Sequence, residues 1–318
     1  MIAPILIALA AGAAAAVMFA SIVSGVLISL ALFYLAPLPL MVTAIAWGPL
    51  YASIGGIAAA IGLGLLVSFP YCIAFVVAVA LPAWWLGHLV MLGRAAEATS
   101  PDAPGAIEWY PIGRILLWIS ALAALTTLAA LLTLGTDADT ITSTLRRALA
   151  RILNAADSPL PPDADRWIDA LIRIAPGGAA MFATLTLSLN LWLAGKISAT
   201  SGRLRRPWPD LRATALPPMT LVALLVAIGF AFSSGLPALI AVIVAAALLM
   251  AYALTGFAVL HTLTLALRSR ALWLGSIYVV IVLFIWPVLA MVVLGLADAA
   301  FDLRHRFGPR QPPPLPVP

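Results

Sequence analysis

The first 93 residues contain no aspartate, glutamate, lysine or arginine. A water-soluble domain needs polar side chains on the outer faces of its helices, and this stretch cannot supply them. About 20 apolar residues make a helix that crosses the roughly 30 Å hydrocarbon core of a bilayer. The stretch is therefore long enough for three or four crossings, and it predicts a membrane protein.

Helices are favoured over strands as the crossing elements. Backbone groups in lipid must bond to one another, so only helices and closed barrels can span a membrane. Barrel strands alternate apolar and polar residues, and the run from Ile57 to Val67 does not. The predicted fold class is all-α, a polytopic transmembrane helical bundle with about eight spans, within a range of seven to ten. Residues 1–299 are expected to form one membrane domain, and residues 300–318 a basic, then proline-rich, disordered tail.

Composition supports this class along the whole chain. Of the 318 residues, 64% are hydrophobic and 9% are charged, against about a quarter charged in ordinary soluble domains. The net charge of +5 comes from basic residues in loops between apolar runs. The expected partners are thus the lipid bilayer, anionic phospholipid head groups and other membrane subunits, and not nucleic acid. Cys72 is the only cysteine, which excludes an intramolecular disulfide and a thiolate metal cluster.

The arginine bias of the chain indicates its source. Lys196 is the only lysine among 17 basic residues, and alanine and proline are abundant. These features indicate a GC-rich bacterial genome. We therefore expect a multi-pass protein of the bacterial inner membrane.

Proline and glycine divide the apolar sequence into segments. The simplest account of residues 2–33 is one tilted or kinked helix, and residues 40–67 form either one bent helix or a short helix followed by a full crossing. Every fourth residue from Ala52 to Gly64 is alanine or glycine, which predicts close helix packing. The remaining expected helices cover about residues 70–92, 112–134, 176–198, 217–233, 237–267 and 271–297.

The run 237–267 is longer than a bilayer requires. At 1.5 Å per residue it would extend roughly 46 Å as a single helix. It must tilt strongly, project from the membrane or break. Gly256 is the favoured position for a break.

The longest polar segment, residues 136–175, predicts two amphipathic helices lying in the membrane interface. In the first, apolar residues recur at helical spacing from Ile141 to Leu153, and three arginines lie on the other side. The second follows Asp163, which can cap its first turn. Together they are expected to cover one mouth of the bundle or to act as a gating lid.

A basic loop follows the expected helix 176–198. Such a cluster beside a membrane span, with Trp208 among its members, is typical of a loop that faces phospholipid head groups. Its basic residues are Arg203, Arg205, Arg206 and Arg212.

The sequence contains no recognised catalytic motif. It has no glycine-rich phosphate loop, no His-Glu-x-x-His, no Cys-x-x-Cys and no serine nucleophile elbow. We therefore predict no enzyme activity, no catalytic residue, no cofactor and no metal. An intramembrane enzyme is the least favoured alternative.

Polar side chains within the apolar runs are the candidate ligand-binding residues. Inserting an ionisable residue at the centre of a membrane costs about 2.5 to 3.5 kcal/mol of free energy, so such residues are the first candidates for a functional role. Each also has a structural alternative: a bridge between helices, a backbone hydrogen bond at the interface, or an ion pair near a helix end. The candidate ligand-binding residues are Asn190, His261 and Asp298. The charges expected to serve structure or partners are Lys196, Asp302 and Arg304.

Two C-terminal segments carry a family resemblance. Gly256-Phe-Ala-Val-Leu-His261 and Gly295-Leu-Ala-Asp-Ala-Ala-Phe-Asp-Leu-Arg304 resemble the C-terminal signature of the YybS-like family, polytopic bacterial membrane proteins without an established activity. This resemblance implies that the polar residues of both segments matter: His261, Asp298, Asp302 and Arg304. The breaks at Pro37-Leu-Pro39 and Gly48-Pro49 are similar to the first half of the substrate-binding components of energy-coupling-factor vitamin transporters.

These observations favour a small-molecule binding or transport component, with a vitamin or metabolite as its ligand. Internal proline and glycine breaks and a few localised polar side chains are typical of sites near the membrane midplane. The alternative is a non-catalytic assembly or scaffold protein of the envelope. In that case the interface helices and the arginine loop would dock partner proteins.

Overall fold

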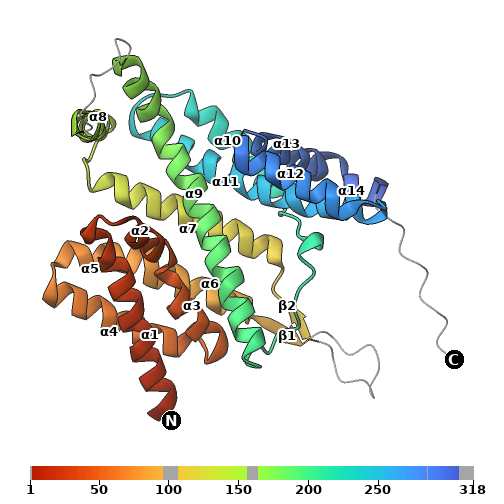
Figure 1. Cartoon of the computed structure of the whole chain (residues 1–318), viewed down its shortest axis with the longest axis horizontal. Helices are drawn as coiled ribbons and strands as arrows, with labels where there is room; N and C mark the ends of the chain where they lie inside the picture. Colours follow the sequence, from red (N-terminus) through yellow and green to blue (C-terminus); the bar gives the residue numbers. More distant parts are fainter. Residues whose placement is uncertain (1, 96–106, 156–163, 285, 308–318) are drawn as a thin grey trace.

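The computed structural model describes residues 2–95, 107–155, 164–284 and 286–307 (Figure 1). Within these ranges the chain is almost entirely helical, and two short strands, β1 (Gly93–Ala95) and β2 (Ile107–Trp109), pair antiparallel. Seven helices are long and apolar enough to cross a membrane. The predicted all-α polytopic bundle is confirmed. The proline-rich part of the expected tail lies outside the described residues.

The seven spans include both continuous and interrupted helices. A π-helical turn, Val76–Ala80, joins α5 to α6 within one span. Helices α10, α12 and α13 are also apolar but are not counted among the seven spans, because they have only 13 to 15 residues. In chain order the helices are α1 (Ile2–Ala20), α2 (Leu27–Leu35), α3 (Pro37–Ala46), α4 (Pro49–Leu66), α5 (Phe69–Phe75), α6 (Leu81–Val90), α7 (Ile112–Leu132), α8 (Ala138–Ala155), α9 (Ala164–Thr200), α10 (Met219–Ala231), α11 (Gly235–Leu263), α12 (Arg270–Phe284), α13 (Val288–Phe301) and α14 (Leu303–Phe307).

The N-terminal spans are divided at glycines. The chain turns at Gly25, whose φ of 67° lies in the left-handed region, so the prediction of one helix over residues 2–33 is wrong. Pro37 instead begins α3, where its missing N–H is tolerated, and α2 and α3 together form one span. Gly48, with φ 111°, then separates α3 from α4. Residues 40–67 are therefore a short helix followed by a full crossing.

The C-terminal spans also differ from expectation. The expected break at Gly256 is absent, because α11 is continuous over 29 residues. The prediction of one helix over residues 271–297 is wrong, because α12 ends at Phe284 and α13 begins after Pro287. Proline lacks the N–H that would continue the earlier helix.

Only the first expected amphipathic helix is a separate element. It is α8, and its Ile141 is buried in a cluster with residues of α7, α9 and α11. The second forms the opening turns of α9, a 37-residue helix that contains Pro176. Arg146 of α8 pairs with Asp169 of α9, which fixes the two elements to each other.

Helices α7 and α9 lie at the centre of the molecule. Figure 1 shows them between the N-terminal helices α1–α6, in red and orange, and the C-terminal helices α10–α14, in cyan and blue. Helix α9 contacts α3 on one side and α11 on the other, while α7 contacts α6 and α11. The two groups of helices are thus joined through this central pair.

Small residues bring helix backbones together, as the sequence predicts for residues 52–64. Ala52 and Ala60 are buried, and a Cβ at Gly56 would lie 3.3 Å from the Ala80 side chain. A tighter approach joins α11 to α13, where a Cβ at Gly256 would meet the backbone of α13. Lipid supplies no hydrophobic driving force between helices, so such close contacts provide much of their association energy.

Replacing Gly256 by alanine should separate α11 from α13. The added Cβ would collide with the Met291 carbonyl group, and overpacking of this kind costs about 1 to 3 kcal/mol. We expect a lower melting temperature for detergent-solubilised protein. Gly229→Ala is the matched control, because a Cβ there meets nothing within 4 Å. Equal melting temperatures for the two variants would contradict the close packing.

Candidate functional site

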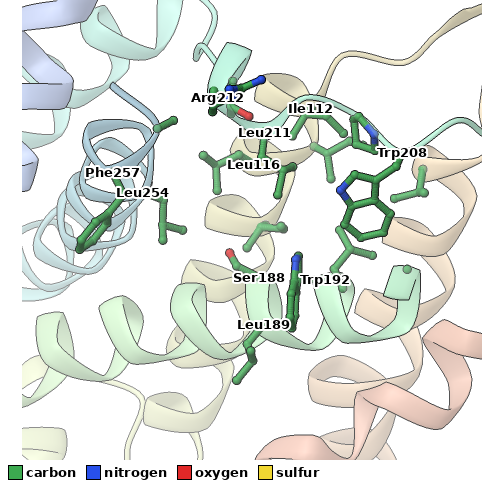
Figure 2. A pocket seen from close by; sticks show the side chains of 18 of the residues that line it. Ile112, Leu116, Ser188, Leu189, Trp192, Trp208, Leu211, Arg212, Leu254 and Phe257 are labelled. Carbon is green, nitrogen blue, oxygen red and sulfur yellow. The ribbon is translucent and has the colours of Figure 1, made fainter. Parts of the chain in front are cut away.

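A cavity of about 550 Å³ lies between α7, α9 and α11. Figure 2 shows Leu254 and Phe257 of α11 on one side of it, and Ser188, Leu189 and Trp192 of α9 below. This volume is within the usual range of about 300 to 1,000 Å³ for small-molecule sites. Most of its lining is aliphatic or aromatic, so it offers an apolar surface within the membrane domain.

The segment that follows α9, residues 201–218, closes one side of the cavity. We call it the 201–218 loop. Its lining residues are Leu204, Arg206, Trp208, Pro209, Leu211, Arg212 and Thr214. Figure 2 shows Trp208, Leu211 and Arg212 above the side chains of α9. The basic loop of the sequence is therefore one wall of the cavity.

An ion pair at the end of α13 holds the 201–218 loop in place. Arg304 Nε donates to Asp298 Oδ2 at 2.9 Å, and the exposed fractions of the two side chains are 14% and 7%. Arg304 Nη1 also donates to the carbonyl oxygens of Arg212 and Thr214, at 2.8 and 3.0 Å. Asp298 thus orients an arginine that binds the loop backbone.

Arg206 is the buried cation of the cavity lining. It is 8% exposed, and its Nη1 donates to the Val90 carbonyl oxygen at 3.2 Å. Burial lowers the pKa of its guanidinium from the ordinary value, although an arginine stays protonated at neutral pH. Within the described ranges, no carboxylate forms an ion pair with it.

Three of the other cations of this region have partners. Arg212 binds the Asp210 carboxylate through two hydrogen bonds of 2.9 and 3.1 Å, and this side-chain bonding lowers the pKa of Asp210. Lys196 Nζ lies 4.1 Å from the centre of the Trp208 ring. The Arg203 guanidinium lies 4.5 Å from the centre of the Trp47 ring. Arg205 is exposed.

His261 lines the cavity from α11. Its Nε2 lies 2.7 Å from the hydroxyl of Tyr278, which comes from α12 and also lines the cavity. Arg270 Nη2 lies 3.4 Å from His261 Nδ1. Phe257 stacks on the Tyr278 ring with centroids 5.7 Å apart. The imidazole and the phenol therefore form a hydrogen-bonding pair at the cavity wall.

Asn190 lies at a different place in the bundle. It is 1% exposed, and its Nδ2 donates to the carbonyl oxygens of Tyr34 and Thr186, both at 2.8 Å. Tyr34 is in the last turn of α2, where carbonyl groups lack intrahelical partners. The side chain also lines a second cavity of about 260 Å³. Its amide bridges α9 to the end of α2.

The three candidate ligand-binding residues do not converge on one site. His261 lines the larger cavity, Asn190 lines the smaller one, and Asp298 binds Arg304. Sequence reasoning did not single out Arg206 from its neighbouring arginines, and it did not identify Tyr278. No local signal separates Arg206 from Arg205, because only the fold buries one and exposes the other.

The fold and the cavity define a polytopic helical membrane protein with an internal small-molecule-sized site. A family model described as "Predicted membrane protein (DUF2232)" matches residues 13–299, so the chain belongs to this membrane protein family of unknown function. Comparison with curated proteins and with solved structures gave no match. The description names neither YybS-like proteins nor energy-coupling-factor transporters, so those two resemblances stay predictions.

Breaking the pair at the end of α13 should destabilise the protein. Either Asp298→Asn or Arg304→Gln leaves one buried charge without its partner, which costs about 3 to 5 kcal/mol. The double variant should lose less unfolding free energy than the two single variants lose together, because it leaves no unpaired charge. Unfolding in detergent measures this coupling. Additive losses would contradict the structural role of the pair.

Proposed function

We propose that this protein is a small-molecule binding or transport component of the bacterial inner membrane, and that its ligand is an amphiphilic metabolite. The observation that carries the proposal is the apolar cavity of about 550 Å³ between α7, α9 and α11. Multi-pass helical proteins belong to inner membranes, whereas bacterial outer-membrane spans are barrels. That contrast supports the proposed location.

The chemistry of the cavity supports an amphiphilic ligand. Its walls include Ile115, Leu116 and Leu254, which offer only apolar contact. Trp192 and Trp208 also line it, and an indole combines a large apolar surface with one N–H donor. A ligand with an apolar body and a polar end would match both kinds of surface.

The arrangement of the helices supports a binding or transport role. The cavity is lined by α7 and α9, which join the two helix groups, and by α11 of the C-terminal group. A shift of one group relative to the other would change the width of this cavity. The break between α2 and α3 adds a discontinuous span, a feature that many transporters share.

The alternative proposal, a non-catalytic assembly or scaffold protein, is favoured by the exposure of α12. None of the residues of this helix is buried, and Trp273 and Val282 are 57% and 77% exposed. A second membrane subunit could pack against such a helix. In that case the cavity would have no ligand, and filling it would leave the activity of the assembly unchanged.

A larger side chain in the cavity should prevent ligand binding. Ser188→Phe places a ring among the lining residues, whereas Ser276→Phe makes the same change at an exposed position of α12 outside the lining. We expect Ser188→Phe to weaken binding of the neutral single-chain amphiphile monoolein at least tenfold, since overfilling costs about 1 to 3 kcal/mol.

Native mass spectrometry of purified protein titrated with monoolein gives the two affinities. Ser276→Phe should bind like the parent protein. Equal binding by the two variants would contradict the proposed site, and absence of binding of any single-chain amphiphile to the parent would favour the assembly role.

A further inference from the structure

We infer that the cavity selects an amphiphile with an anionic head group, and that Arg206 recognises this head group. The inference rests on the proposed function and names the chemical class of its ligand. The ligand would be a membrane-borne molecule whose head is an oxyanion, a carboxylate or a phosphate, and whose chain lies against the apolar walls.

The charge of Arg206 has no counter-ion among the described residues. A guanidinium carries five N–H donors, and among the described residues Arg206 has one acceptor, the neutral carbonyl oxygen of Val90. Burying a cation without a counter-ion is unfavourable, and Arg206 is only 8% exposed. An oxyanion in the cavity would supply both the missing charge and acceptors for a two-pronged hydrogen bond.

The described lining of the cavity favours an anion by its charge. Among the residues that the structure describes, this lining includes two arginines and a histidine but no aspartate or glutamate. Arg212 is neutralised by Asp210, so it does not compete with Arg206 for the head group. Lys196 rests on the Trp208 ring and adds positive potential nearby. An anion is therefore favoured over a neutral or cationic group of the same size.

The charge of Arg206 lies at one end of the apolar surface of the cavity. Arg206 belongs to the 201–218 loop, beyond the end of α9, and its guanidinium lies 5.9 Å from the centre of the Trp109 ring. Tryptophan and arginine are typical of the level where lipid head groups lie. The apolar walls extend from there along α7, α9 and α11. A bound amphiphile would thus lie as lipids do, with its head at the interface.

This arrangement favours a membrane amphiphile over a free anion as the ligand of the cavity. Inorganic phosphate would satisfy Arg206 but would leave the apolar walls without contact. A neutral lipid would fill the walls but would leave the guanidinium unpaired. Only a molecule with an anionic head group and an apolar chain would both pair with Arg206 and contact the apolar walls.

The test compares ligands that share one oleoyl chain. Monoolein is neutral, oleate carries a carboxylate and oleoyl lysophosphatidic acid carries a phosphate, while inorganic phosphate serves as the free anion. We expect the parent protein in neutral detergent to bind at least one of the two acidic amphiphiles about tenfold more tightly than monoolein, as expected for one charge-assisted hydrogen-bonded pair. Native mass spectrometry measures the affinities.

Variants assign the preference to one residue. Arg206→Gln should abolish the preference for acidic chains over monoolein. Arg205→Gln removes the same charge from an exposed position of the same loop and should keep the preference. If Arg206→Gln keeps the preference, or if inorganic phosphate competes as well as the amphiphiles, the inference is overturned.

Two further measurements keep the test decisive. Arg206→Lys retains the charge and should keep a reduced preference for acidic chains, so it replaces the glutamine variant if that variant fails to fold. Equal binding of neutral and acidic chains by the parent protein overturns the inference. Monoolein binding separates the two proposals. If the parent binds monoolein and acidic chains equally, only the head-group inference fails, whereas no binding of any chain removes the proposed function as well.

Discussion

The need to satisfy every backbone hydrogen bond without water determines this structure. In lipid that need leaves helices as the spanning elements, and it restricts where a helix can end. The chain turns at Gly25 and Gly48, where positive φ angles are tolerated. At the break between α2 and α3, the Asn190 amide supplies a partner for the Tyr34 carbonyl group. This hydrogen bond to a backbone carbonyl group explains why the polar Asn190 side chain is buried in the apolar core.

The same constraint explains how the cavity is built. Helices α7 and α9 join two helix groups, and α11 completes the wall on the C-terminal side. The 201–218 loop has little regular structure, so its carbonyl groups need other donors. Arg304 donates hydrogen bonds to two of them, and Asp298 orients the arginine by pairing with it. This ion pair therefore helps to hold the loop against the cavity. The charged residues near the membrane boundary therefore position the wall that carries Arg206.

Sequence patterns were sufficient for the parts that depend on composition and periodicity. The uncharged opening predicted the helical spans, and the spacing of apolar residues after Ile141 predicted α8. The boundary over residues 2–33 is wrong because the chain turns at Gly25, whose left-handed backbone a sequence pattern does not reveal. The boundary over residues 271–297 is wrong because α13 begins after Pro287, and local sequence does not distinguish a proline that ends a helix from one that bends it. Gly256 was expected to break α11, but its small size serves contact with α13. The burial of Arg206 depends on tertiary packing alone, so no sequence pattern reveals it.

The inferred pairing joins Arg206, which lines the cavity, to an anion that the protein does not supply. A cryo-electron microscopy map of the protein in nanodiscs made of phosphatidylcholine and phosphatidylglycerol tests it most directly. We expect elongated density between α7, α9 and α11, with one end within hydrogen-bonding distance of the Arg206 guanidinium. A cavity filled by protein side chains, or an aspartate or glutamate of the chain paired with Arg206, would contradict it.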